Sequence, residues 1–124
     1  MFQQEENSFK KMQRGLIWIF KMSYIIIKTT FAKKEEAEEV AKKIINSNLA
    51  ACVQISEIES YYRWNNKVES ANEYKVEIKT TDKNYKEVEE LITKNHKYEL
   101  PEIISYKLNN GSKKYFDWID KEVK

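Results

Sequence analysis

Apolar and polar residues follow one another in a way that predicts a first strand and then a helix. Residues 24–30, YIIIKTT, are largely apolar and β-branched, which is typical of a buried strand. Within residues 33–48, apolar side chains recur at helical spacing, at Ala37, Val40, Ala41, Ile44 and Ile45. Glu38 and Lys42, four positions apart, lie on the opposite face. The pattern predicts an amphipathic helix that ends at the polar residues 46–48.

The next signals predict two long strands and a second helix. Residues 49–64 contain no Gly or Pro, and residues 67–81 run back from them. In the return run, apolar or aromatic positions alternate with charged ones, with Tyr74, Val76, Ile78 and Thr80 against Glu73, Lys75, Glu77 and Lys79. Such alternation is typical of a half-buried antiparallel strand. Residues 82–96 carry one apolar helical stripe, and Asn84 with Glu87 has capping-box spacing.

Residues 102–108 predict a last strand, and residues 112–123 a short C-terminal helix. The order is therefore strand, helix, strand, strand, helix, strand, followed by a terminal helix. This order is that of the split βαβ, or ferredoxin-like, fold. We expect an α+β domain in which two helices cover one face of an antiparallel sheet.

The hairpin formed by the second and third strands is too long for its own domain. Fifteen extended residues reach roughly 50 Å, whereas a domain of this size is about 34 Å across. A free two-stranded arm is marginal in water, so we expect it to pack on another copy of the chain. Tyr61, Tyr62 and Trp64 would supply the apolar contacts, and Asn65 with Asn66 would form a two-residue turn.

The first 21 residues do not share this pattern. They are interpreted either as a non-essential extension of a domain at 22–124 or as an organellar targeting segment. The apolar run at 16–20 is too short to span a bilayer. Residues 1–22 hold four basic and two acidic groups, so the rest of the chain is neutral. A neutral domain argues against nucleic acid as a partner, and the lone Cys52 favours a reducing, cytoplasmic location.

Five short motifs together resemble the CutA1 family of divalent-cation tolerance proteins. They are LAACVQI at 49–55, Ser60 with Tyr62 and Trp64, VEIKTT at 76–81, HKYELPEI at 96–103, and Tyr115 with Trp118. The resemblance implies a homotrimer in which long hairpins join sheets between subunits. It implies a role in tolerance of metal ions, with copper or another divalent ion bound by some members. It also implies a likeness to the trimeric PII signalling proteins.

Departures from the family pattern bear on the metal site. Asn66 stands where the family has glycine, and Lys97 replaces a proline. Some members carry a cysteine and a second histidine at positions that correspond to Lys28 and Asn95 here. A metal site that used those groups would be reduced to His96.

The candidate metal ligands are therefore His96, Cys52 and Glu102, with Glu99 as a further oxygen donor. Each has an ordinary alternative. The histidine could cap the second helix, the cysteine could be a small buried apolar residue, and the glutamates could be solvated. A divalent metal such as copper is the expected ligand, and the chain itself is the expected partner.

A second candidate site is a ligand cleft formed by Lys79, Tyr98 and Tyr62, in which the lysine would meet an anionic ligand. The alternative for Lys79 is a cross-strand ion pair. Trp118, with Tyr115 and Phe116, is expected in the core or at the trimer interface.

Catalytic motifs and a phosphate-binding loop are missing from the sequence, so we expect a protein that is not an enzyme. An RNA-binding domain with this strand order would need a glycine and aromatic run in its third strand, which reads EYKVEIKTT here. The main alternative to metal response is a stable PII-like signalling or scaffold trimer. Such a trimer would bind a small anionic ligand or a partner protein.

Overall fold

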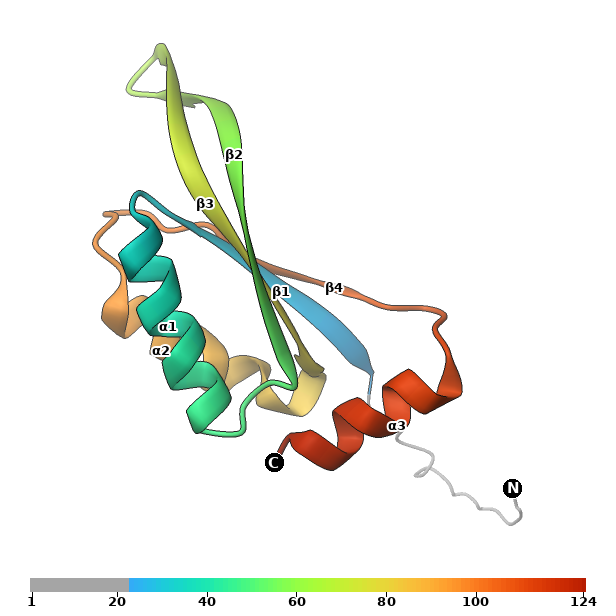
Figure 1. Ribbon diagram of the computed structural model, residues 1–124. Coiled ribbons are helices and arrows are strands. Elements are labelled where there is room, and N and C mark those ends of the chain that lie inside the picture. Colours follow the sequence, from blue (N-terminus) through green and yellow to red (C-terminus); the bar gives the residue numbers. More distant parts are fainter. Residues whose placement is uncertain (1–22) are drawn as a thin grey trace.

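The computed structural model describes residues 23–124 and has the strand and helix order that the sequence predicts (Figure 1). The strands are β1 (Tyr24–Phe31), β2 (Cys52–Trp64), β3 (Lys67–Thr81) and β4 (Ile103–Lys107). The helices are α1 (Lys34–Asn46), α2 (Tyr85–Asn95), which follows a 3₁₀ turn at Asp82–Asn84, and α3 (Lys113–Glu122). The ferredoxin-like α+β prediction is therefore confirmed.

The four strands form one antiparallel sheet in the order β2-β3-β1-β4. Strand β1 pairs with β3 along its whole length, from Tyr24 opposite Thr81 to Phe31 opposite Tyr74. Helices α1 and α2 lie against one face of this sheet (Figure 1). The core between them is made of fully buried side chains such as Ile27, Phe31, Val40, Ile44, Val76, Ile78, Val88 and Ile92.

The long hairpin extends beyond the sheet as a two-stranded arm (Figure 1). Pairing of β2 with β3 continues from Ile58 opposite Glu73 to Trp64 opposite Lys67, past the last residue that β1 pairs. Seven residues in each strand make this arm roughly 23 Å long. Asn65 and Asn66 turn the chain with φ of 52° and 64°, so the predicted two-residue turn is confirmed. Asparagine tolerates this left-handed region better than most residues do.

Asn84 does not form the predicted capping box. Its side chain accepts no hydrogen bond from the helix. The buried amide instead donates to the Thr80 and Thr81 hydroxyls and to the Lys124 carbonyl. The capping-box prediction was wrong because a 3₁₀ turn precedes α2, and the side chain faces the C-terminal end of the chain.

Helix α3 lies against the end of the sheet near the start of β1 (Figure 1). Ile119 is fully buried there. The Phe116 ring stacks on Tyr24 with centroids 4.2 Å apart, and the Tyr24 hydroxyl donates to Asp120. Ser112 caps the helix by accepting from the Tyr115 amide. The buried side of α3 holds this short helix against the end of the sheet.

The predicted extension, residues 1–21, lies outside the described residues. The extension and the domain boundary at residue 22 therefore stay predictions. Within residues 23–124, no helix is both long enough and apolar enough to cross a membrane.

Candidate functional site

A cleft of about 680 Å³ opens where the arm leaves the sheet. The arm contributes Ser60, Tyr62 and Trp64 to its wall. The opposite wall is the segment between α2 and β4, which contributes Tyr98 and Glu99. The predicted cleft residues Tyr62 and Tyr98 therefore share one cavity, although they are 36 positions apart in the chain.

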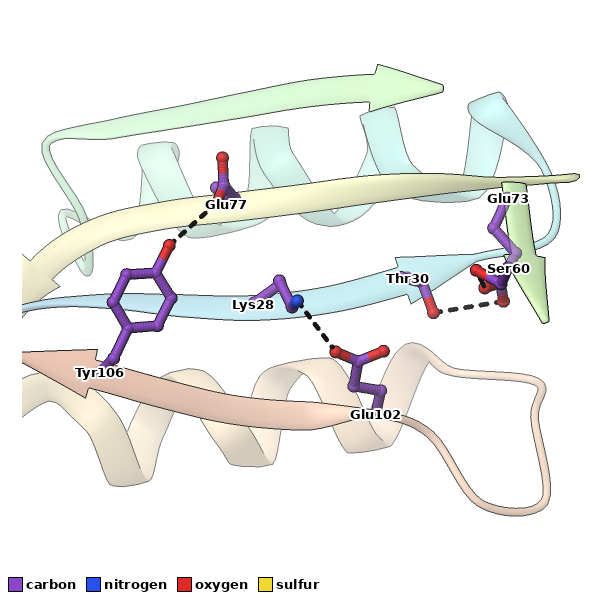
Figure 2. Close-up of polar contacts among 7 residues, drawn as sticks. All are labelled: Lys28, Thr30, Ser60, Glu73, Glu77, Glu102 and Tyr106. Carbon is purple, nitrogen blue, oxygen red and sulfur yellow. Dashed lines mark hydrogen bonds and ion pairs between the residues drawn. The ribbon is translucent and has the colours of Figure 1, made fainter. Parts of the chain in front are cut away.

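Glu73 lies at the base of the arm and is only 8% exposed. Its carboxylate accepts hydrogen bonds from the hydroxyls of Ser60 at 2.7 Å, Thr30 at 3.2 Å and Tyr98 at 2.7 Å. Figure 2 shows Thr30 and Ser60 converging on this carboxylate from strands β1 and β2. The contacts join β1, both strands of the arm and the segment after α2, so Glu73 fixes how the arm leaves the sheet.

His96 continues this network on the other side of Tyr98. Its Nε2 donates to the Thr30 carbonyl at 2.7 Å, and its Nδ1 accepts from the Tyr98 amide at 3.2 Å. Its ring stacks on Phe31 with centroids 4.3 Å apart. Both ring nitrogens are thus engaged, and the pair of bonds fits the neutral imidazole with its proton on Nε2.

Burial, together with the hydrogen bond to Glu73, raises the pKa of Tyr98 well above its ordinary value. The phenol therefore stays protonated at neutral pH and acts as a hydrogen-bond donor. The Glu73 carboxylate accepts from three hydroxyls, so its role in the single chain is to hold them in place.

The predicted metal ligands do not meet in one chain. Cys52 lies opposite Lys79 on the sheet, near the start of β1, whereas His96 contacts Thr30 near its end. The β1 positions that lie beside Cys52 and beside His96 are four residues apart, or roughly 13 Å. Glu102 forms an ion pair with Lys28 at 3.5 Å (Figure 2). Among residues 23–124, no group of three His, Cys, Asp or Glu side chains lies close enough to hold a metal ion.

Lys79 also lies away from the cleft. Its ammonium donates to the Tyr115 hydroxyl at 3.3 Å and lies 5.4 Å from the centre of that ring. Among the described residues that line the cleft there is no lysine, and the lining holds four carboxylates and one guanidinium: Glu59, Glu73, Glu99 and Glu102 with Arg63. Within one chain, the cleft is therefore acidic and aromatic, which does not suit the anionic ligand expected from Lys79.

The aromatic residues predicted for the trimer interface are all exposed in the single chain. Tyr61 is 73% exposed, and Tyr62, Trp64 and Trp118 are between 39% and 45% exposed. Strand alternation places Tyr62 and Trp64 on one face of the arm and Tyr61 on the other face. Large apolar groups on both faces of an arm are unusual for a surface that meets only water.

The sequence pattern did not single out Glu73. Its strand alternates strictly, and that alternation placed it with solvated charges such as Lys75 and Glu77. The structure buries it because the arm and the segment after α2 close over this position. The only local signal is the hydroxyl residues Thr30 and Ser60, whose importance depends on a strand register that one sequence does not reveal.

Comparison with known proteins agrees with the fold and the motifs. Residues 25–122 match the family described as CutA1 divalent ion tolerance protein. A divalent-cation tolerance protein CutA from Archaeoglobus fulgidus is 38% identical over 89 residues, which are 72% of this chain and 87% of that protein. The chloroplastic protein CutA of Arabidopsis thaliana is 36% identical over 96 residues, 77% of this chain and 53% of that one.

Solved structures of proteins from the same family also match this chain. The structure of the periplasmic divalent cation tolerance protein CutA from Archaeoglobus fulgidus matches with a TM-score of 0.79 at 36% identity. The match covers 82% of this chain and 99% of that one. Sequence and fold agree over the same region, and the chain belongs to the CutA1 divalent ion tolerance protein family.

Proposed function

We propose that this chain is a homotrimeric protein that works in tolerance of divalent cations, binds such cations weakly and is not an enzyme. The observation that carries the proposal is family membership over residues 25–122, with a relative named for divalent-cation tolerance at 38% identity.

The arm supports the trimer. It extends beyond its own sheet with exposed aromatics on both faces, and β2 and β4 are the two edge strands of the described sheet. Unpaired strand edges favour pairing with another chain. Closed symmetric association is the usual way in which identical chains cover such surfaces.

His96, Cys52 and Glu102 remain the proposed metal ligands. Coordination by His96 would have to displace its hydrogen bond to Thr30 or to Tyr98. Coordination by Glu102 would compete with its ion pair to Lys28. Both costs support weak binding of copper or another divalent ion, with ligands from more than one subunit.

Light scattering on the purified chain tests the trimer, and a monomer would overturn it. Calorimetric titration with Cu²⁺ and Zn²⁺ tests the ligands. His96→Ala and Cys52→Ala are expected to weaken binding, whereas Glu38→Gln, on the exposed face of α1, is the matched control. Unchanged affinity in both ligand variants would remove the proposed site.

A cytoplasmic location is part of the proposal, with an organelle as the alternative. The Arabidopsis relative is named chloroplastic, and the Archaeoglobus structure is described as periplasmic, so members of this family occupy more than one compartment. Expression of the full chain with a C-terminal fluorescent tag would distinguish the two locations for this protein. A PII-like or scaffold role stays a prediction.

A further inference from the structure

The loop between β4 and α3 contains the only Asn-Gly pair in the sequence, Asn110 with Gly111 (Figure 1). Both residues are exposed and lie outside the described helices and strands. Within residues 23–124, the Gly111 amide donates to no backbone carbonyl. Its nitrogen is therefore accessible to the side chain of the residue before it.

An asparagine side chain can react with the backbone nitrogen of the next residue, and glycine permits the close approach because it has no Cβ. The Gly111 amide gives its proton to solvent, and its nitrogen bonds to the side-chain carbonyl carbon of Asn110. The side-chain nitrogen takes up a proton from water and leaves as ammonia. Water then opens the resulting succinimide ring at either carbonyl, which leaves aspartate or isoaspartate.

Another asparagine followed by a small residue, Asn46 before Ser47, shows the contrast. The Ser47 amide donates to the Lys43 carbonyl at 3.1 Å, at the end of α1. This hydrogen bond holds the nitrogen away from the Asn46 side chain. Of the two pairs, only Asn110 with Gly111 combines a small following residue with an amide that the described backbone leaves free.

Isoaspartate at position 110 would lengthen the backbone beside the contact that docks α3. It routes the chain through the former side chain and so adds a methylene before the nitrogen of Gly111. A Cβ on Gly111 would already lie 2.5 Å from the Phe116 ring, and that ring stacks on Tyr24. A contact this close does not accept added length without a shift. Aspartate instead keeps the backbone length and adds a negative charge near the start of α3, where such a charge is favourable.

We propose that Asn110 is a site of spontaneous deamidation, and that its isoaspartate product loosens α3 from the end of the sheet. The proposal does not depend on the role in cation tolerance, because this loop contains none of the proposed metal ligands. The loop also contains none of the aromatic residues expected to contact another copy of the chain. Molecules with a loosened α3 would accumulate as the protein ages.

Ageing of the full-length protein in warm, mildly alkaline buffer tests the reaction. Mass spectrometry of separated peptides identifies the aspartate and isoaspartate products, which we expect at residue 110 and not at Asn46. Asn110→Gln should abolish both products, because the longer side chain closes a ring less readily. Asn109→Gln, exposed in the same loop, is the matched control and should react as the wild type does. An intact Asn110 in the folded protein, under conditions in which the urea-unfolded chain deamidates, overturns the proposal.

Thermal unfolding tests the effect on α3. Aged wild type and aged Asn109→Gln should melt at lower temperature than the fresh proteins, in proportion to their isoaspartate content. Aged Asn110→Gln should melt as it does when fresh. Freshly prepared Asn110→Asp should melt like the fresh wild type, because it has the added charge without the longer backbone. An unchanged melting temperature in a sample rich in isoaspartate, or an equal loss in Asn110→Gln, overturns the effect on α3.

Discussion

The Tyr98 phenol and the Glu73 carboxylate are joined by a 2.7 Å hydrogen bond that connects the segment after α2 to the base of the arm. The same carboxylate also holds Thr30 and Ser60, so one side chain orients three structural elements.

Glu73→Ala is expected to destabilise the protein by about 1–3 kcal/mol, because it leaves partly buried hydroxyls without their acceptor. Glu73→Gln keeps an acceptor oxygen and should cost less. Urea unfolding at one fixed protein concentration measures both, since association changes apparent stability. Equal loss in the two variants would mean that the charge, and not hydrogen bonding, holds the network.

Alkaline pH should weaken the contact between α3 and β1. The hydrogen bond to Asp120, then burial, raises the pKa of Tyr24 from 10.0 to about 12. Below pH 10 the phenol is protonated in both the folded and the unfolded state, so the hydrogen bond contributes its full stabilisation. Between pH 10 and 12 only the folded state keeps the proton, so the free energy of unfolding falls as the pH rises. Tyr24→Phe should be less stable at neutral pH but lose stability less steeply across this interval.

Thermal unfolding between pH 9 and 12 measures the effect. Asp120→Asn removes the negative partner and should move the steep region to lower pH. Identical slopes in the wild type and Tyr24→Phe would show that the alkaline loss arises elsewhere, for example at Tyr98.

The arm turn should be sensitive to residue type. Asn65→Ala places alanine at a φ of 52°, a region that costs L-residues roughly 1–2 kcal/mol. Asn66→Gly should be neutral or stabilising at its φ of 64°. Asn72→Ala, exposed within β3, is the control for losing an asparagine side chain. We expect Asn65→Ala to have the lowest melting temperature of the three variants. A different order would contradict the idea that the left-handed backbone of the turn requires these residues.

Gly111 makes room for the ring that docks α3. A Cβ at this position would lie 2.5 Å from the Phe116 ring, which is stacked on Tyr24 and has little freedom to move. Gly111→Ala should therefore cost about 1–3 kcal/mol as an overpacking effect. A double-mutant cycle with Phe116→Ala measures the coupling in unfolding free energy. Additive losses would show that the two positions do not interact.

The elements of this fold could be predicted from the sequence because their signals are local. The alternation from Tyr74 to Thr80 and the helical stripe from Ala37 to Ile44 each follow from neighbouring residues. The length of the arm follows from counting residues.

The site depends on contacts between distant residues, and it was predicted only in part. Tyr62 and Tyr98 do share a cleft, but Lys79 points to Tyr115 at the other end of the sheet. The failed capping box at Asn84 has the same origin in part, because one of its three partners is the carbonyl of the distant Lys124. Such contacts depend on strand register and on which distant segments fold against each other. The spacing of residues along the sequence does not reveal either.

The arm also has a consequence for the dynamics of the backbone. Within the described residues, the two strands of the arm pair only with each other from Ile58 to Glu73, so in a lone copy this ladder is the first part of the sheet to open. Its amide protons should then exchange with solvent far faster than those of Ile27 or Ile78. Slow exchange along the arm would mean that another chain lies on it. The exchange rates of the arm's amide protons therefore distinguish a lone copy from an assembled one.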